Sequence, residues 1–303
     1  MSPITHVRHV ALAVPDFEKE RDFLGGIWGL TEAAGGPDLA FFAAKSSPEP
    51  YLLRLRRADQ RRTDLYAFAA NSRAGVCALH ERAAARGARI VRAPQALMSL
   101  GGGFGFQLFD CDGRLVEISA EVEERVPEPV APKAAVPMGL SHVVFHTPQL
   151  KATVAWYEEV LDLRVSDWLG EGMAFLRGGG ATHHCVAFID CAAALNHIAF
   201  EMANADEMMR GLGRMLRNEV TLMWGPGRHT AGDNTFAYFV SPAGNIFEYT
   251  AEVENLPADW TPRSLPRTPE IMDQWGTGRM TDPARVPPPA ADPALWNTDP
   301  LGR

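Results

Sequence analysis

The stretch HVALAVPDFEKERDFLGGIWGL, residues 9–30, recurs in the same chain as HVVFHTPQLKATVAWYEEVLDL, residues 142–163. The two stretches align without a gap at an offset of 133 residues (142 − 9), and they share a histidine, a valine, a proline and the final leucine. Internal similarity of this kind indicates a duplicated structural unit, and it governs the whole fold assignment. The chain therefore consists of two similar halves.

The two halves also end alike, because GRLVEISAEVE at 113–123 aligns with GNIFEYTAEVE at 244–254. Within the second half, a strand-like run, an amphipathic helix pattern and further strand-like runs occur twice, separated by segments that contain glycine or proline. The helix patterns are QLKATVAWYEEVLDL and ADEMMRGLGRMLR. We expect an α+β protein of two domains, each built from two βαβββ modules.

The expected boundaries follow from composition. Proline, alanine and charged residues are concentrated around residues 123–137, as is typical of a linker. The sequence therefore predicts an N-terminal domain at 1–122, a C-terminal domain at 138–255 and a proline-rich tail at 256–303. The tail is expected to lack regular structure. Residues 287–303 are equally compatible with disorder and with order. Trp260, Trp275 and Trp296 indicate that part of the tail packs on the body, on a neighbouring subunit or at the pocket mouth.

Composition favours a small molecule as the partner. The 303 residues are 46% hydrophobic and 22% charged, and the net charge of -8 with scattered basic residues argues against nucleic acid. No apolar run approaches the roughly 18 residues of a membrane helix. The N-terminus lacks a signal-peptide pattern, so we expect a cytoplasmic protein without a membrane partner. The four cysteines show no CxxC spacing and are expected to be reduced thiols.

Three strand-like runs of the second half each carry one strong metal ligand. They are SHVVFH with His142, LNHIAFE with His197 and AGNIFEYT with Glu248. One histidine in an apolar strand is more often a core residue than a ligand. The three together favour a metal, because a carboxylate among large apolar side chains is costly to bury without a cation or hydrogen-bond donors. Two imidazoles and a carboxylate suit Fe(II), with Mn(II) as a possible substitute, and leave half of its coordination sphere open.

These modules and ligand-bearing runs resemble the vicinal oxygen chelate superfamily, and within it the two-domain type I extradiol ring-cleavage dioxygenases, over about residues 5–255. The run GPGRHTAGDNTFAYFVSPAGNIFEY places His229, Tyr238 and Glu248 at successive spacings of 9 and 10 residues, as that family does. HHCVAF matches the family's strand with a further active-site histidine, and we assign that role to His184.

The resemblance implies an extradiol dioxygenase that inserts O2 into a catechol-type aromatic diol, in the degradation of aromatic compounds. It implies that His184 transfers a proton near dioxygen, and that His229 and Tyr238 hydrogen-bond the substrate oxygens. The implied partners are a small aromatic diol and O2. A homo-oligomer is also expected, since such assemblies are common in the family.

Strand alternation places Val144 and His146 on the same face as His142, so we expect both in the substrate pocket. His146 either recognises a polar substituent of the substrate or caps the end of its strand. Leu176, in the strand-like run MAFLRG, is assigned to the same pocket.

The repeat also predicts that the first half binds no metal. The positions equivalent to the three ligands are His9, Leu65 and Glu117, and leucine cannot coordinate a metal. His9 and Glu117 are then structural remnants that can hydrogen-bond to one another.

Three other functions fit parts of the pattern. A glyoxalase-type metal-dependent lyase or isomerase shares the modules but draws its ligands from them in a different pattern. A 4-hydroxyphenylpyruvate dioxygenase-like enzyme keeps the triad without His184, His229 and Tyr238. A noncatalytic small-molecule binding protein of the same fold has no need of intact metal ligands.

Overall fold

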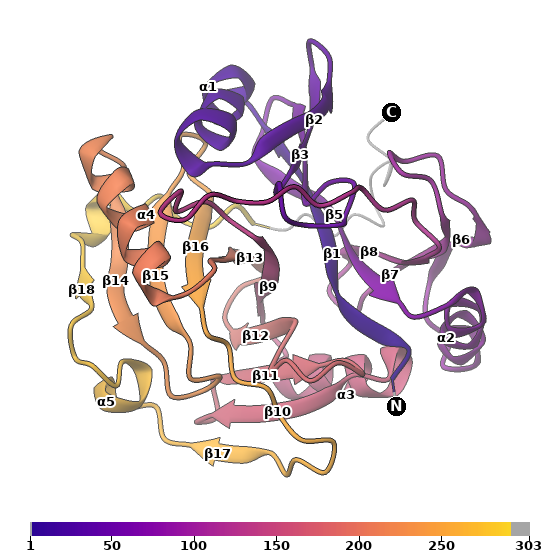
Figure 1. Ribbon diagram of the computed structural model, residues 1–303. Coiled ribbons are helices and arrows are strands. Elements are labelled where there is room, and N and C mark those ends of the chain that lie inside the picture. Colours follow the sequence, from indigo (N-terminus) through magenta and orange to yellow (C-terminus); the bar gives the residue numbers. More distant parts are fainter. Residues whose placement is uncertain (1, 292–303) are drawn as a thin grey trace.

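The computed structural model describes residues 2–291 and contains two β-sheets, one from each half of the chain (Figure 1). The first sheet has eight strands in the order β2-β3-β4-β1-β5-β8-β7-β6. Its strands are β1 Ile4–Val14, β2 Thr31–Gly35, β3 Leu39–Ala43, β4 Leu53–Arg57, β5 Arg62–Ala70, β6 Ile90–Ala96, β7 Phe104–Phe109 and β8 Leu115–Ala120. The helices of this half are α1 Phe17–Asp22, the π-helix η1 Phe23–Trp28 and α2 Arg73–Ala85.

The second sheet has ten strands in the order β17-β10-β11-β12-β9-β13-β16-β15-β14-β18. Its strands are β9 Gly139–Thr147, β10 Arg164–Leu169, β11 Met173–Arg177, β12 Val186–Asp190, β13 Ala194–Glu201, β14 Leu222–Arg228, β15 Thr235–Val240, β16 Ile246–Ala251, β17 Arg263–Leu265 and β18 Arg279–Met280. The helices are α3 Leu150–Leu161, α4 Ala205–Arg217, α5 Pro269–Met272 and the 3-10 helix η2 Pro283–Arg285.

Each sheet is made of two modules joined at its centre. In the first half β1 pairs in parallel with β4, β5 pairs in parallel with β8, and β1 and β5 join the two modules antiparallel. In the second half β9 and β12, β13 and β16, and β9 and β13 repeat the same three pairings. The expected α+β architecture of paired βαβββ modules is confirmed, while the exact domain and linker boundaries remain a prediction.

The strand register reproduces the sequence repeat residue by residue. His142 lies opposite Ala199, which lies opposite Glu248 on the next strand. In the first sheet, His9, Ala67 and Glu117 occupy the same three places. His197 and Leu65 each precede the central alanine by two residues and therefore lie on its face of the sheet. The two sheets therefore have equivalent backbone positions for His142 and His9, His197 and Leu65, the central alanine, and Glu248 and Glu117.

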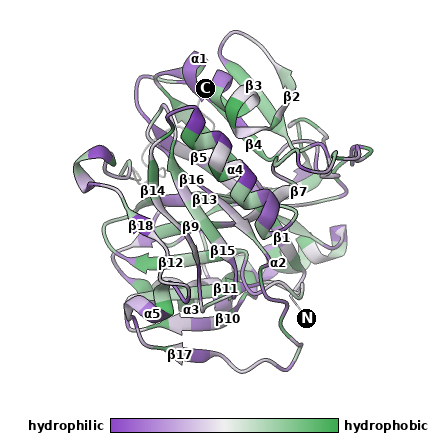
Figure 2. Ribbon diagram, turned by 60° about the vertical axis from the view of Figure 1, so that its left-hand side comes forward, coloured by the Kyte–Doolittle hydropathy of each residue, from purple (hydrophilic) through white to green (hydrophobic). Residues whose placement is uncertain are grey.

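Helix α4 illustrates how the sequence fixes the outer layer. It begins after Asn204, whose side chain accepts the backbone N–H of Glu207 and caps the helix. Met208, Leu212 and Met215 recur at helical spacing and are buried, while hydrophilic residues alternate with them along the ribbon (Figure 2). The helix thereby covers one face of the β14–β16 region of the sheet.

The two halves pack through aromatic side chains close to the candidate metal ligands. Trp28, from η1 of the first half, is fully buried and stacks on Tyr249 of β16 with ring centroids 4.0 Å apart. The Tyr249 hydroxyl donates to the Trp28 carbonyl at 2.6 Å. Because Tyr249 follows Glu248, the first half directly supports the strand that carries this carboxylate.

The tail is more regular than its proline content predicts. Strand β17 pairs in parallel with β10, and β18 pairs antiparallel with β14, so the tail extends both edges of the second sheet. Trp260 donates its indole N–H to the carbonyl of Ser166 at 2.8 Å, whereas Trp275 is half exposed. The expectation of an irregular tail is therefore wrong for these segments, because exposed sheet edges offer backbone groups with which a short strand can pair. Trp296 lies outside the described residues.

Across residues 2–291, no helix has both the length and the apolar character required to cross a membrane.

Candidate metal centre and active site

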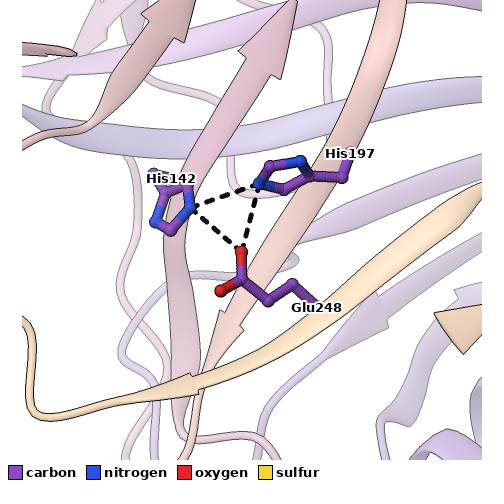
Figure 3. Close-up of side chains that lie close together, drawn as sticks. All are labelled: His142, His197 and Glu248. Atoms are coloured by element: carbon purple, nitrogen blue, oxygen red, sulfur yellow. Dashed lines mark hydrogen bonds and ion pairs between the residues drawn. The ribbon is translucent and has the colours of Figure 1, made fainter. Parts of the chain in front are cut away.

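Three neighbouring strands at the centre of the second sheet bring His142, His197 and Glu248 together (Figure 3). His142 Nε2 and His197 Nε2 lie 3.2 Å and 3.1 Å from Glu248 Oε2, and the two nitrogens are 3.4 Å apart. Among the described residues these three form the group of His, Cys, Asp and Glu side chains that could hold a metal, with their ligand atoms all within 4.8 Å of one another.

The outer nitrogens of both imidazoles are occupied by hydrogen-bond partners. His197 Nδ1 lies 2.6 Å from the Asn196 side-chain oxygen, which can only accept, so Nδ1 carries the proton. His142 Nδ1 is likewise bonded to the Ser141 hydroxyl at 3.0 Å. The proton on His197 Nδ1 leaves its Nε2 lone pair directed at the same point as Glu248, as metal-binding histidines require, and the Ser141 hydroxyl can accept the corresponding proton of His142.

Glu248 is fully buried, and neither of its oxygens receives a hydrogen bond of good geometry from a described protein group. Burial alone would raise the pKa of this carboxyl, but attraction to His142 and His197 outweighs burial and holds the pKa at about 2. Burial lowers the pKa of His197, which favours a neutral imidazole. An ionised carboxylate and two imidazole nitrogens that converge on one point fit a divalent cation bound on one side.

His184 lies beside this group and His229 and Tyr238 lie near it. The His184 ring is 4.2 Å from the His142 ring, and burial among other histidines holds the pKa of His184 well below its ordinary value. Tyr238, directly opposite Glu248 in the register, has its hydroxyl 2.9 Å from His229 Nε2. Burial also lowers the pKa of His229.

The His229–Tyr238 pair has a defined hydrogen-bond direction. His229 Nδ1 lies 2.7 Å from the carbonyl of Met272 in the tail, so Nδ1 donates to it. The neutral ring then accepts at Nε2 from the Tyr238 hydroxyl. The phenol oxygen keeps its lone pairs for a hydroxyl group of a bound molecule.

A cavity of about 280 Å³ lies beside the candidate ligands. Its lining includes His142, His184, His197, His229 and Tyr238 but not Glu248. The remaining polar lining comes from Asn196, Asn234 and Arg267, and the apolar lining from Val144, Leu169, Met173, Phe175, Ile189, Met223, Trp224, Ala231, Ile271, Met272 and Met280. Four of these residues, Arg267, Ile271, Met272 and Met280, belong to the tail. The tail therefore forms one wall of the cavity.

Of the expected pocket residues, Val144 lines the cavity as predicted from strand alternation. His146 is not among the lining residues; its Nε2 instead accepts a hydrogen bond from the Asn196 amide at 2.7 Å. The assignment of Leu176 to the pocket is wrong. Leu176 is fully buried in the core cluster on the opposite face of β11, and its neighbour Phe175 faces the cavity.

The equivalent face of the first sheet carries different chemistry. The His9 ring is bonded to the Tyr51 hydroxyl at 3.1 Å, and Glu117 accepts from the Gln107 amide at 2.9 Å. The predicted bond between His9 and Glu117 is therefore wrong. Leu65 is buried where His197 stands in the second sheet.

Sequence reasoning missed several site residues. Asn196 directly precedes a ligand, and its side chain joins His146 to His197. His183 bonds His184, and Asp167 bonds His183. Only the adjacency of Asn196 and His183 to site histidines was visible in the sequence, because their partners lie on other strands.

Comparison with known proteins agrees with this geometry. Residues 139–249 match the model of the Glyoxalase/Bleomycin resistance protein/Dioxygenase superfamily. The crystal structure of the Mn(II)-bound glyoxalase from Novosphingobium aromaticivorans is similar, with 39% identity, a TM-score of 0.94, and coverage of 99% of this chain and 100% of that one.

Two curated relatives are similar over most of their length. Metapyrocatechase 2 of Cupriavidus necator is 29% identical over 292 residues, which cover 89% of this chain and 88% of the relative. The manganese-dependent 2,3-dihydroxybiphenyl 1,2-dioxygenase of Geobacillus genomosp. 3 is 24% identical over 277 residues, which cover 84% and 87%.

Proposed function

Because the chain belongs to the glyoxalase/bleomycin resistance protein/dioxygenase superfamily, we propose that it is an extradiol dioxygenase that cleaves a catechol-type aromatic diol beside its two hydroxyl groups. The observation that carries the proposal is that His142 and His197, which form one group with Glu248, line a single cavity together with His184 and Tyr238. The relative named metapyrocatechase supports it.

The resident metal is proposed to be Fe(II), held by His142, His197 and Glu248 on one side. The donor set suits Fe(II) and Mn(II) alike, and similar proteins are named for either metal. A relative from Rhodococcus jostii is named an iron-dependent extradiol dioxygenase, whereas the Geobacillus relative and the Novosphingobium structure are named for manganese. A metal held by these residues would supply Lewis acidity and electron transfer for the reaction of a diol with dioxygen.

The surrounding side chains bind the diol and move its protons. A substrate hydroxyl donates to the Tyr238 oxygen, whose own proton is directed at His229 Nε2. The Met272 carbonyl stabilises positive charge on His229 because it already accepts its Nδ1–H. His184, on the other side of the ligands, is proposed to exchange a proton with the reacting oxygen.

The lining of the cavity favours a neutral aromatic diol with an apolar substituent. Methionine, phenylalanine and tryptophan supply six of the eleven apolar lining residues, and Arg267 is exposed at the mouth. Apolar walls bind such a ring and exclude water from the reaction. His146 is proposed to support Asn196 rather than to contact substrate.

The chain's two halves are proposed to differ in role. Residues 138–255 form the catalytic domain and residues 1–122 a scaffold without metal, since Leu65 replaces a ligand. A metal site contained in one half is the arrangement expected of the dioxygenase rather than of an enzyme that draws ligands from both halves.

The test is anaerobic reconstitution of metal-free protein with Fe(II) or Mn(II), followed by oxygen uptake on catechol, 3-alkylcatechols and 2,3-dihydroxybiphenyl. One O2 consumed per diol, with a yellow ring-fission product, supports the proposal. Absence of turnover with both metals on the whole panel would contradict it.

A glyoxalase-type reaction is the second candidate, because the similar structure with 39% identity is described as a glyoxalase. The same reconstituted protein should then convert the glutathione adduct of methylglyoxal without consuming oxygen. His184→Ala distinguishes the two, since it should impair oxygen-dependent cleavage while leaving the metal content unchanged.

A further inference from the structure

A continuous chain of hydrogen bonds runs from the tail to the cavity through Arg263, Asp167, His183 and His184. The Arg263 guanidinium donates to both oxygens of Asp167 at 2.6–3.1 Å, and its backbone N–H donates at 3.0 Å. Asp167 Oδ2 lies 2.9 Å from His183 Nε2. His183 Nδ1 in turn lies 2.9 Å from His184 Nδ1.

The negative charge of Asp167 determines which atom donates in its hydrogen bond with His183. Burial alone would raise the pKa of Asp167, but the hydrogen bonds from His183 and Arg263 outweigh burial and hold the pKa below its ordinary value. An ionised carboxylate only accepts, so His183 Nε2 must carry a proton. Arg263 forms an ion pair with the same carboxylate.

The position of the proton on His183 then determines which histidine donates in the bond between His183 and His184. In the tautomer with its proton on Nε2, His183 has a lone pair on Nδ1, which needs a donor. The group facing it is His184 Nδ1, so the proton in this bond belongs to His184. With its proton on Nδ1, the buried His184 has its other ring nitrogen, Nε2, available on the side of the cavity.

We propose that Asp167 and His183 are positioning residues that hold His184 in the tautomer with its proton on Nδ1, so that its Nε2 lone pair is available to the cavity. The inference rests on the proposed function for the role of His184, but not for the tautomer itself. His184 then enters the reaction as a proton acceptor. A proton taken from the diol at Nε2 leaves the Nδ1–H bond intact, and the same proton is later returned to the product.

The arrangement also gives the tail a second role beyond forming a cavity wall. Arg263 is the first residue of β17 and the residue that balances Asp167. Pairing of β17 with β10 therefore places the Arg263 guanidinium on the carboxylate that accepts from His183. Docking of the tail and the orientation of His184 are coupled through one ion pair.

Histidine 15N NMR tests the tautomer directly, on metal-free protein and on protein loaded with diamagnetic Zn(II). The expected result for His184 is a protonated Nδ1 and an unprotonated Nε2. A protonated Nε2 on His184 in both samples would overturn the inference, whatever the activity of the enzyme.

Kinetics of paired variants separate positioning from structural support. His183→Phe keeps a ring at this position but removes the acceptor, and it should lower kcat on the order of 100-fold with KM and metal content nearly unchanged. His183→Asn retains an oxygen that can accept from His184 and should recover at least about tenfold of that loss. Equal losses in both variants would contradict the proposal.

Asp64→Asn is the matched control. Asp64 is a buried carboxylate held by Arg56 and Arg62 in the first half, so its replacement has a comparable structural cost far from His184. It should leave both kcat and the His184 spectrum unchanged. If the unmodified protein cleaves no diol, the proposed function fails, while the NMR spectrum still decides the tautomer.

Discussion

Replacement of Glu248 by Gln should abolish the stabilisation that a bound metal gives to this protein, and the internal repeat supplies the control. Glu117 occupies the same register position in the first sheet and is also buried. Glu117→Gln therefore makes the same chemical change in the same backbone setting. The two variants differ in whether two imidazoles converge on the carboxylate.

The magnitude follows from linkage. At a free metal concentration 100-fold above Kd, binding stabilises the folded state by about 2.7 kcal/mol. For a chain of this size, each kcal/mol corresponds to roughly 2–4 °C in Tm, so the metal should raise Tm by roughly 5–10 °C. If the loss of one of three ligands weakens binding about 100-fold, the same metal concentration gives about 0.4 kcal/mol, or about 1 °C.

The assay is differential scanning calorimetry of metal-free protein with and without Mn(II), which is stable in air, together with metal analysis of desalted samples. The unmodified protein and Glu117→Gln should show the full increase in Tm and about one metal per chain. A full increase in Glu248→Gln, or its loss in Glu117→Gln, would refute the assignment of the metal to the second sheet.

Three further outcomes are expected. Tyr238→Phe removes the hydroxyl that bonds His229 and should lower kcat about 10–100-fold without changing the metal content. His146→Ala leaves Asn196 without one partner and should weaken metal binding about tenfold; a changed preference among substituted diols would instead favour a substrate contact. In metal-free protein, the pKa of Glu248 falls from 4.5 to about 2 on folding, so its stabilisation of about 3 kcal/mol is present above about pH 4.5 and is lost as the pH falls towards 2. Urea unfolding from pH 7 to pH 3 should therefore show the gap between the unmodified protein and Glu248→Gln closing in acid.

The repeat and the ligand runs were enough to predict the fold and the grouping of the triad. Duplicated modules must pair alike, so residues at matching offsets reach matching places, as the shared register of His142 and His9 confirms. Period-two alternation also placed Val144 beside His142. These inferences depend on local pattern and symmetry, which a single sequence contains.

The predictions were wrong where the sequence does not specify which face of a strand meets the cavity or which distant groups meet in space. Alternation relates Phe175 to Leu176 as opposite faces but does not say which of them faces the cavity. The bond between His183 and Asp167 joins groups 16 residues apart across strands, and no spacing rule predicts it. The tail gained structure because the sheet edges offered partners, a tertiary effect that overrides proline content.

The first half explains why the fold alone does not determine the chemistry. By strand register, three positions of the first sheet differ from their equivalents in the second. Tyr51 is equivalent to His184, Gln107 to Tyr238 and Leu65 to His197. Burial raises the pKa of Glu117, whereas the same backbone position in the second sheet has a pKa of about 2. The backbone is shared and the burial is similar, so the difference in proton affinity comes from the two imidazoles. A carboxyl group that favours its proton is a poor metal ligand, and one that is ionised beside two imidazoles is a good one. Substitution of Leu65 by His would therefore be only the first of several changes needed to give the first sheet the same site.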